Sequence, residues 1–168
     1  ESMRKVIALL PDKQGQKIWD VGCGTGLLLL FLVNAVRQGM IYYGSDQLSV
    51  GLSQARIRAR ELRVSDRVVC VQSDITVAPV FKEYSLDIVV AHFSIYTIHK
   101  NDKRHLALKN MYRVLKPGGL LIVCCPSENY DAGKIIEESC EFLRARKGLL
   151  QTAIKRIFFY PFTKGMGL

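Results

Sequence analysis

The sequence predicts a single α/β domain over residues 1–168, with a mostly parallel sheet between two layers of helices. Five short apolar runs alternate with segments of helical periodicity, the first run ends in a glycine-rich turn before an apolar helix, and polar residues follow the ends of later runs. Right-handed crossovers place those ends along one edge of a parallel sheet, where ligands bind. With 49% hydrophobic residues, the chain can bury one core.

The glycine-rich turn lies in residues 17–26, KIWDVGCGTG. A short apolar strand ends in glycines at alternate positions, Gly22, Gly24 and Gly26, and the uncharged segment 27–36 follows. These glycines let the backbone adopt positive φ and let a ligand lie against bare main chain, while the N–H groups at the helix start carry partial positive charge. The turn therefore predicts a cradle for part of a nucleotide-like cofactor. The alternative is a tight connection that binds nothing.

A carboxylate follows each of the next two predicted strands. The strand 41–45 ends at Asp46, which lies beside the glycine turn and can accept hydrogen bonds from both hydroxyls of a ribose. The alternative is that Asp46 caps the next helix, a role that Ser49 can also fill. The strand 68–72 leads to Asp74, for which a structural turn is the alternative.

The rest of the chain continues the alternation of helices and strands. The turn 116–119, KPGG, leads into the fifth strand. The further predicted elements are the end of a helix at 5–10, a helix at 48–62, a strand at 86–91, a helix that ends at 115, a strand at 120–125 and a helix at 131–143.

The charge and the cysteines bear on partners and location. The net charge of +9 raises the question of an anionic partner such as nucleic acid, and Arg56, Arg60, Arg63 and Arg67 lie along one stripe. An arginine stripe beside the core face of a helix is usually solvated, so nucleic acid is not favoured. The five cysteines form no C-x-x-C pair and no histidine has metal-ligand spacing, which favours a reducing cytoplasm and predicts no metal site.

The glycine turn resembles the first motif of the class I S-adenosylmethionine (SAM) dependent methyltransferases, an acidic residue followed by G-x-G-x-G, here DVGCGTG at 20–26. A dinucleotide fingerprint would need a further glycine where Leu27 stands. The string RVLKPGG at 113–119 is similar to another motif of the family. The resemblance is to its small-molecule "type 11" group and covers residues 5–143. It implies a three-layer Rossmann-like sandwich with core strand order 3-2-1-4-5.

The resemblance also implies site residues. In the family, an acid at the position of Asp74 binds the adenine amino group, and the next N–H, here that of Ile75, faces a ring nitrogen. His92 and His99 lie where the family places the wall of the reaction site and are candidate general bases, with structural packing as the alternative. The implied cofactor-binding residues are Asp20, Gly22, Cys23, Gly24, Gly26, Asp46, Gln47, Asp74, Ile75, Ala91 and His92.

The implied function is methyl transfer from SAM to a small-molecule or lipid-like acceptor, with S-adenosylhomocysteine as the product. The sulfonium of SAM activates the methyl group, so the protein mainly aligns the acceptor and excludes water. Two alternatives stay open. One is a SAM-binding module without turnover, and the other is an NAD-linked oxidoreductase, which Leu27 disfavours.

The end of the chain departs from the family pattern. The family fold adds two strands after its fifth helix, whereas 149–168 contains one strand-like run, 157–160, before Pro161. We therefore expect the final two strands to be missing and the domain to be truncated at its C-terminus. The fifth strand then has an open edge that can recruit 157–160 as a substitute. The alternative for 149–162 is a basic amphipathic segment in peripheral contact with a membrane.

Overall fold

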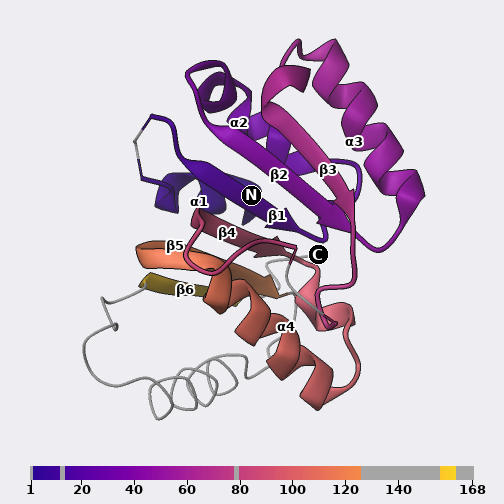
Figure 1. Ribbon diagram of the computed structural model, residues 1–168, viewed down its shortest axis with the longest axis vertical. Coiled ribbons are helices and arrows are strands. Elements are labelled where there is room, and N and C mark those ends of the chain that lie inside the picture. Colours follow the sequence, from indigo (N-terminus) through magenta and orange to yellow (C-terminus); the bar gives the residue numbers. More distant parts are fainter. Residues whose placement is uncertain (1, 12–13, 78–79, 126–155, 162–168) are drawn as a thin grey trace, which may run out of the picture.

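The computed structural model describes residues 2–11, 14–77, 80–125 and 156–161 (Figure 1). Its sheet has six strands in the order β3-β2-β1-β4-β5-β6, and every neighbouring pair is parallel. The strands are β1 (Lys17–Val21), β2 (Ile41–Asp46), β3 (Val68–Gln72), β4 (Leu86–His92), β5 (Leu115–Cys125) and β6 (Arg156–Pro161). The helices are α1 (Ser2–Leu9), α2 (Leu27–Arg37), α3 (Ser49–Glu61) and α4 (Asn101–Val114), with the 3₁₀ turns η1 (Ser65–Arg67) and η2 (Ile95–Thr97).

The predicted core order 3-2-1-4-5 is confirmed, and with it the three-layer arrangement. Strand order reverses at β1, which pairs with β2 on one side and with β4 on the other. The loops that follow β1 and β4 therefore leave the sheet in opposite directions and open a crevice at the carboxyl ends.

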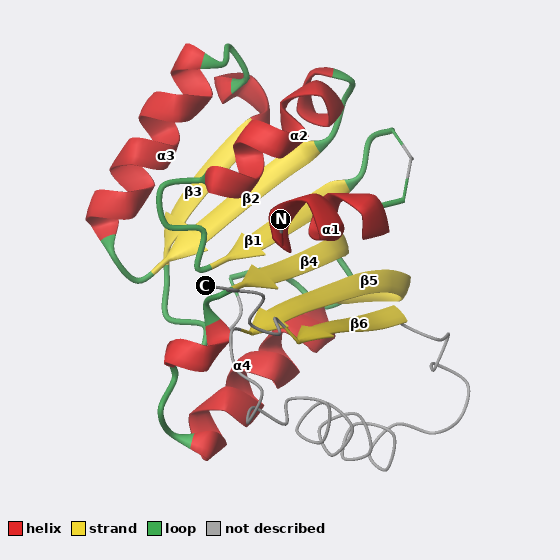
Figure 2. Cartoon of the chain, turned by 180° about the vertical axis from the view of Figure 1, so that it is seen from behind, coloured by secondary structure: helices red, strands yellow, loops and turns green. Residues whose placement is uncertain are grey.

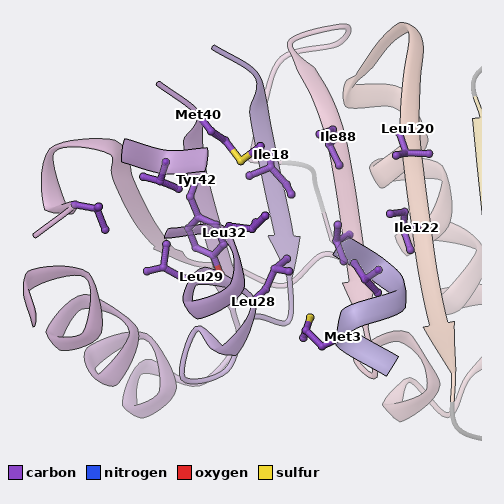
Figure 3. Packing of buried hydrophobic residues seen from close by; sticks show 14 of the residues in the cluster. Met3, Ile18, Leu28, Leu29, Leu32, Met40, Tyr42, Ile88, Leu120 and Ile122 are labelled. Atoms are coloured by element: carbon purple, nitrogen blue, oxygen red, sulfur yellow. The ribbon is translucent and has the colours of Figure 1, made fainter. Parts of the chain in front are cut away.

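Each face of the sheet buries its own apolar cluster because successive side chains of a strand point to opposite faces. Ile18 and Ile88 join residues of α1 and α2 on one face, as Figure 3 shows. Trp19 and Val89 join residues of α4 on the other. Figure 2 shows α1 and α2 in front of the sheet and α4 behind it. Strands buried on both faces read as continuous apolar runs, which is why these runs were recognisable in the sequence.

The last strand changes the expected end of the sheet. The run 156–161 pairs in parallel with β5, from Leu120 opposite Arg156 to Cys125 opposite Pro161. The predicted recruitment of 157–160 to the edge of the fifth strand is therefore confirmed, and with 156–161 paired to it β5 is not an open edge. Residues 156–161 of the proposed amphipathic segment are strand, while its remainder and the predicted helix at 131–143 lie outside the described residues.

Two predicted boundaries also move. The predicted turn 116–119 lies inside β5, which begins at Leu115 instead of Leu120. Its pairing with β4 shifts between Leu86 and Ile88, so the extra residues form a bulge in a continuing strand. The first helix ends at Leu9, one residue earlier than expected.

A carboxylate ties three strands together at their amino ends. Asp87 Oδ2 of β4 accepts a hydrogen bond from the backbone N–H of Lys17 in β1 at 2.9 Å. Its Oδ1 accepts one from Lys116 Nζ in β5 at 2.7 Å. This end of the sheet lies opposite the carboxyl ends, where the crevice is.

Candidate active site

The glycine turn after β1 is held in a conformation that requires glycine. Gly22, Gly24 and Gly26 have φ of 67°, 51° and 73°, in the left-handed region that side chains disfavour. A Cβ on Gly22 would lie 2.3 Å from the Cβ of Ser94, so the loop after β4 approaches bare backbone here. The N–H of Cys23 donates to the carbonyl of Ser45 at 2.9 Å, which fastens the turn to β2.

Asp46 connects this turn to the start of α3. Its Oδ2 accepts the N–H of Gly24 at 2.8 Å, and its Oδ1 accepts the N–H of Leu48 at 2.9 Å. The side chain of Ser49 does not cap α3. A carboxylate offers about four lone-pair positions, so two remain for a ligand in the crevice. Asp46 is therefore both a structural anchor and an available acceptor.

The turn after β3 presents Asp74 and Ile75. Asp74 Oδ1 accepts both the N–H and the hydroxyl of Thr76 at 2.8 Å, and these bonds hold the pKa of Asp74 below its usual value. The Gln47 side chain and Lys103 lower this pKa further. Asp74 therefore stays ionised at neutral pH and can accept a hydrogen bond from an amino group.

A cavity of about 720 Å³ lies at these carboxyl ends. Its wall combines the ends of β1, β2 and β3 with residues 93–100 after β4. Six residues implied from the sequence line it, namely Gly22, Asp46, Gln47, Asp74, Ile75 and His99. The other implied residues do not line it, namely Asp20, Cys23, Gly24, Gly26, Ala91 and His92. This volume lies in the range of pockets that hold a drug-sized ligand.

Sequence reasoning missed several lining residues, including Ser73, Ser94, Lys100 and Lys103. The hydroxyl oxygens of Ser73 and Ser94 are buried and have no hydrogen-bond partner among the described residues. Both serines follow a strand end by one or two residues, and that position is the signal that could have found them. Buried hydroxyls without partners favour a polar ligand in this cavity, since such groups rarely stay unsatisfied.

Asp20 lies beneath the turn and not in the cavity. It is 3% exposed, and its Oδ2 accepts the Tyr42 hydroxyl at 2.5 Å. Burial raises the pKa of Asp20 to about 7, although the Tyr42 hydrogen bond opposes that rise. Its contact is thus with β2 under the glycine turn.

The two histidines occupy different surroundings. His92 Nε2 lies 3.0 Å from the hydroxyl of Ser2 in α1, and the His92 ring lies against Phe93 with centroids 4.2 Å apart. Burial lowers the pKa of His92, so this ring is neutral at pH 7. His99 is exposed and lines the cavity. Of the two histidines, His99 is the one that a molecule bound in the cavity could contact.

Phe93 marks the bend between β4 and the cavity wall. Its φ of 55° is left-handed, which is unusual for a residue with a side chain and costs about 1–3 kcal/mol. Its N–H donates to the Cys124 carbonyl at 3.0 Å, so β5 holds this conformation in place. Strain of this kind concentrates where a loop must be aimed at a ligand.

Within the described residues, no helix has the length and apolar character needed to cross a membrane. Likewise, the described part of the chain holds no group of three or more side chains that could bind a metal ion.

Comparison with known proteins gives the family. Residues 19–123 match the Methyltransferase domain family. The Ubiquinone/menaquinone biosynthesis C-methyltransferase UbiE of Haemophilus ducreyi is 35% identical over 111 residues, which cover 66% of this chain and 41% of that protein. The chain therefore belongs to the Methyltransferase domain family and spans about two fifths of the length of this curated relative.

Solved structures agree on the fold. A SAM dependent methyltransferase from Aquifex aeolicus superposes with a TM-score of 0.69 at 20% identity, covering 82% of this chain and 78% of that one. A SAM-dependent methyltransferase from Geobacter sulfurreducens, solved with S-adenosylhomocysteine, gives a TM-score of 0.56 at 24% identity and covers 72% and 46%. The predicted resemblance to the class I SAM-dependent methyltransferases is confirmed. The comparisons reported above give no support to the alternative of an NAD-linked oxidoreductase.

Proposed function

We propose that this chain transfers a methyl group from SAM to a small-molecule or lipid-like acceptor. The observation that carries the proposal is that polar groups from separate strand ends meet at one cavity. In a chain of the Methyltransferase domain family, the glycine turn, the carboxylates Asp46 and Asp74, and Ile75 all meet at one cavity where strand order reverses. A structural turn alone does not require three separate strand ends to present polar groups to the same space.

Different residues of the cavity are placed to bind different parts of the cofactor. Asp46 accepts hydrogen bonds from the ribose hydroxyls with the lone pairs that Gly24 and Leu48 leave open. Asp74, which is ionised, accepts the adenine amino group, and the Ile75 N–H faces the neighbouring ring nitrogen. Gly22 lines the cavity, so the amino-acid part of the cofactor can lie against the glycine turn. These contacts fit the polar and apolar parts of SAM.

The protein's share of the chemistry is alignment. SAM supplies an activated methyl group on its sulfonium, so the residues of the cavity wall have to hold the acceptor in line with it and exclude water. Ile95 and Ile98 contribute apolar surface to that wall. Where the acceptor must lose a proton, His99 is the group placed to take it, with a ring nitrogen as the site of protonation.

The acceptor class follows from the relatives and the wall. The similar UbiE protein is named for ubiquinone and menaquinone biosynthesis, so a quinone precursor is the first acceptor to test.

The described cysteines, Cys23, Cys70, Cys124 and Cys125, are free thiols, which supports a cytoplasmic location for this activity.

The test is turnover of SAM by the wild-type chain with a panel of acceptors that includes a demethylated quinone. Formation of S-adenosylhomocysteine together with methylated acceptor supports the proposal. Tight SAM binding without turnover on any acceptor would favour the SAM-binding module instead. The matched control is the same reaction without acceptor, which measures hydrolysis alone.

A further inference from the structure

Asn110 is a polar residue on the otherwise apolar buried face of α4. It is 7% exposed, and its side-chain Nδ2 donates to the backbone carbonyl of Ile75 at 2.7 Å. Ala107, Leu108 and Met111 around it are apolar and belong to the cluster on that face of the sheet. An amide placed there lowers stability unless it is bonded, so its partner identifies its role.

The carbonyl that Asn110 holds belongs to the turn after β3. In the peptide between Ile75 and Thr76, Asn110 fixes the C=O, and Asp74 Oδ1 accepts the N–H at 2.8 Å. In the preceding peptide, the Asp74 carbonyl accepts the N–H of Val77 at 3.1 Å. Two consecutive peptide planes are therefore fixed, and Asn110 supplies the bond that comes from a different element.

Of the four polar backbone groups in these two peptides, three have hydrogen-bond partners. Among the described residues the N–H of Ile75 has no hydrogen-bond partner, although Ile75 is 8% exposed and lines the cavity. A buried N–H without a partner costs free energy, and a ligand acceptor in the cavity removes that cost. This N–H lies in the peptide between Asp74 and Ile75, which Val77 holds, and that peptide is joined at the Ile75 Cα to the peptide that Asn110 holds.

We infer that Asn110 is a positioning residue for adenine recognition, because it orients the Ile75 backbone whose N–H meets the base. This inference rests on the proposed function. A hydrogen bond weakens steeply as its angle falls, so the N–H must stay aimed at the ring nitrogen next to the amino group. Without Asn110 the Ile75 carbonyl is buried and unpaired, and the turn rotates toward water. The protein then discriminates less strongly between a ligand that has a hydrogen-bond-accepting nitrogen at that ring position and a ligand that lacks it.

The experiment compares two ligands and two proteins. Calorimetry measures S-adenosylhomocysteine and its 1-deaza analogue, in which a C–H replaces that ring nitrogen, against wild type and Asn110→Leu. The wild-type chain should bind the analogue roughly tenfold more weakly, which corresponds to one lost hydrogen bond. In Asn110→Leu, S-adenosylhomocysteine should bind roughly tenfold more weakly than to wild type, and the ratio between the ligands should fall to about twofold.

Leu108→Ala is the matched control. Leu108 is 3% exposed in the same helix and cluster, so its truncation destabilises the fold without removing the bond to Ile75. It should keep the wild-type ratio between the two ligands. An Asn110→Leu protein that also keeps the full ratio overturns the inference. Failure of the wild-type chain to bind S-adenosylhomocysteine overturns the proposed function, which is a different result.

A second variant covers the case in which Asn110→Leu does not fold. Asn110→Ala has no side-chain donor and adds no bulk to the cluster, and it should lose the ratio in the same way. If neither variant folds, nuclear magnetic resonance of the wild-type chain decides. A shift of the Asn110 side-chain amide on binding S-adenosylhomocysteine that the 1-deaza analogue does not produce supports the inference, and equal shifts with both ligands overturn it.

Discussion

Replacing Asp46 with alanine removes one carboxylate that serves two purposes. In the free protein the variant loses the acceptors for the N–H groups of Gly24 and Leu48. In the complex it also loses the proposed bonds to the two ribose hydroxyls. The first loss acts on the shape of the glycine turn, and the second acts on the ligand directly, so both weaken SAM binding.

The magnitude follows from the second loss. Hydrogen bonds to a charged group contribute about 1.5–3 kcal/mol each, but Asp46 is partly exposed at a strand tip, where solvent reduces that value. We therefore expect a loss of about 1.4 to 2.7 kcal/mol, which is roughly tenfold to a hundredfold weaker binding. Global stability should fall by only about 1–2 kcal/mol, since water can reach the freed N–H groups.

Calorimetric titration with S-adenosylhomocysteine, together with urea denaturation, separates the two effects. Asp46→Asn keeps one side-chain carbonyl oxygen and should bind with intermediate affinity. Asp66→Ala is the control, because it makes the same charge change at a side chain that is 73% exposed on η1 and does not line the cavity. Unchanged affinity in Asp46→Ala would remove this carboxylate from the site and refute the reasoning.

Three further predictions concern ligand, pH and backbone. SAM or S-adenosylhomocysteine at a hundredfold excess over its dissociation constant should stabilise the chain by about 2.7 kcal/mol in thermal melts, whereas NADH should not. Because the folded pKa of Asp20, about 7, exceeds its unfolded value, the folded chain holds the extra proton, and stability should fall as pH rises from about 4 to about 7. Asp20→Asn, which keeps an acceptor for Tyr42, should flatten that dependence in urea titrations. Gly22→Ala should lose about 2–4 kcal/mol, because it combines left-handed strain with overlap on Ser94, while Gly15→Ala, with similar φ and open space, should lose only about 1–2 kcal/mol.

Each of these predictions has an outcome that contradicts it. A melt that shifts with NADH and ignores both adenosyl ligands would contradict the cofactor assignment. A pH profile that is the same in Asp20→Asn and wild type would show that Asp20 does not hold the proton. Equal losses for the two alanine variants would mean that Ser94 moves aside freely.

The sequence predicted the parts of the candidate site that depend on local chain pattern. The glycine turn, Asp46 and Asp74 were found because each follows a short apolar run, and parallel strands bring such ends together. The sequence put His92 in the cofactor set because it follows the predicted fourth strand, and in the structure it is the last residue of β4 and contacts Ser2 of α1. Strand alternation could have shown this, since His92 shares a face with Ile88.

Other features could not be read from the sequence. Asn110 reaches a carbonyl 35 positions away, and helical periodicity gives no sign of that partner. For the 156–161 run, the sequence predicted only that 157–160 could join the edge of β5, and it did not predict the parallel direction or the register of that pairing. Ser94 was missed because its approach to Gly22 depends on the bend at Phe93. These are contacts between elements, which local pattern does not encode.

The carboxylate of Asp87 separates two properties of the molecule. It ties β1, β4 and β5 at the ends of the strands that lie farthest from the cavity, through Lys17 and Lys116. Substitutions there act on the cohesion of the sheet, and none of these three residues lines the cavity. Directed evolution toward heat tolerance can therefore concentrate on this end, while the cavity wall formed by residues after β4 is varied independently.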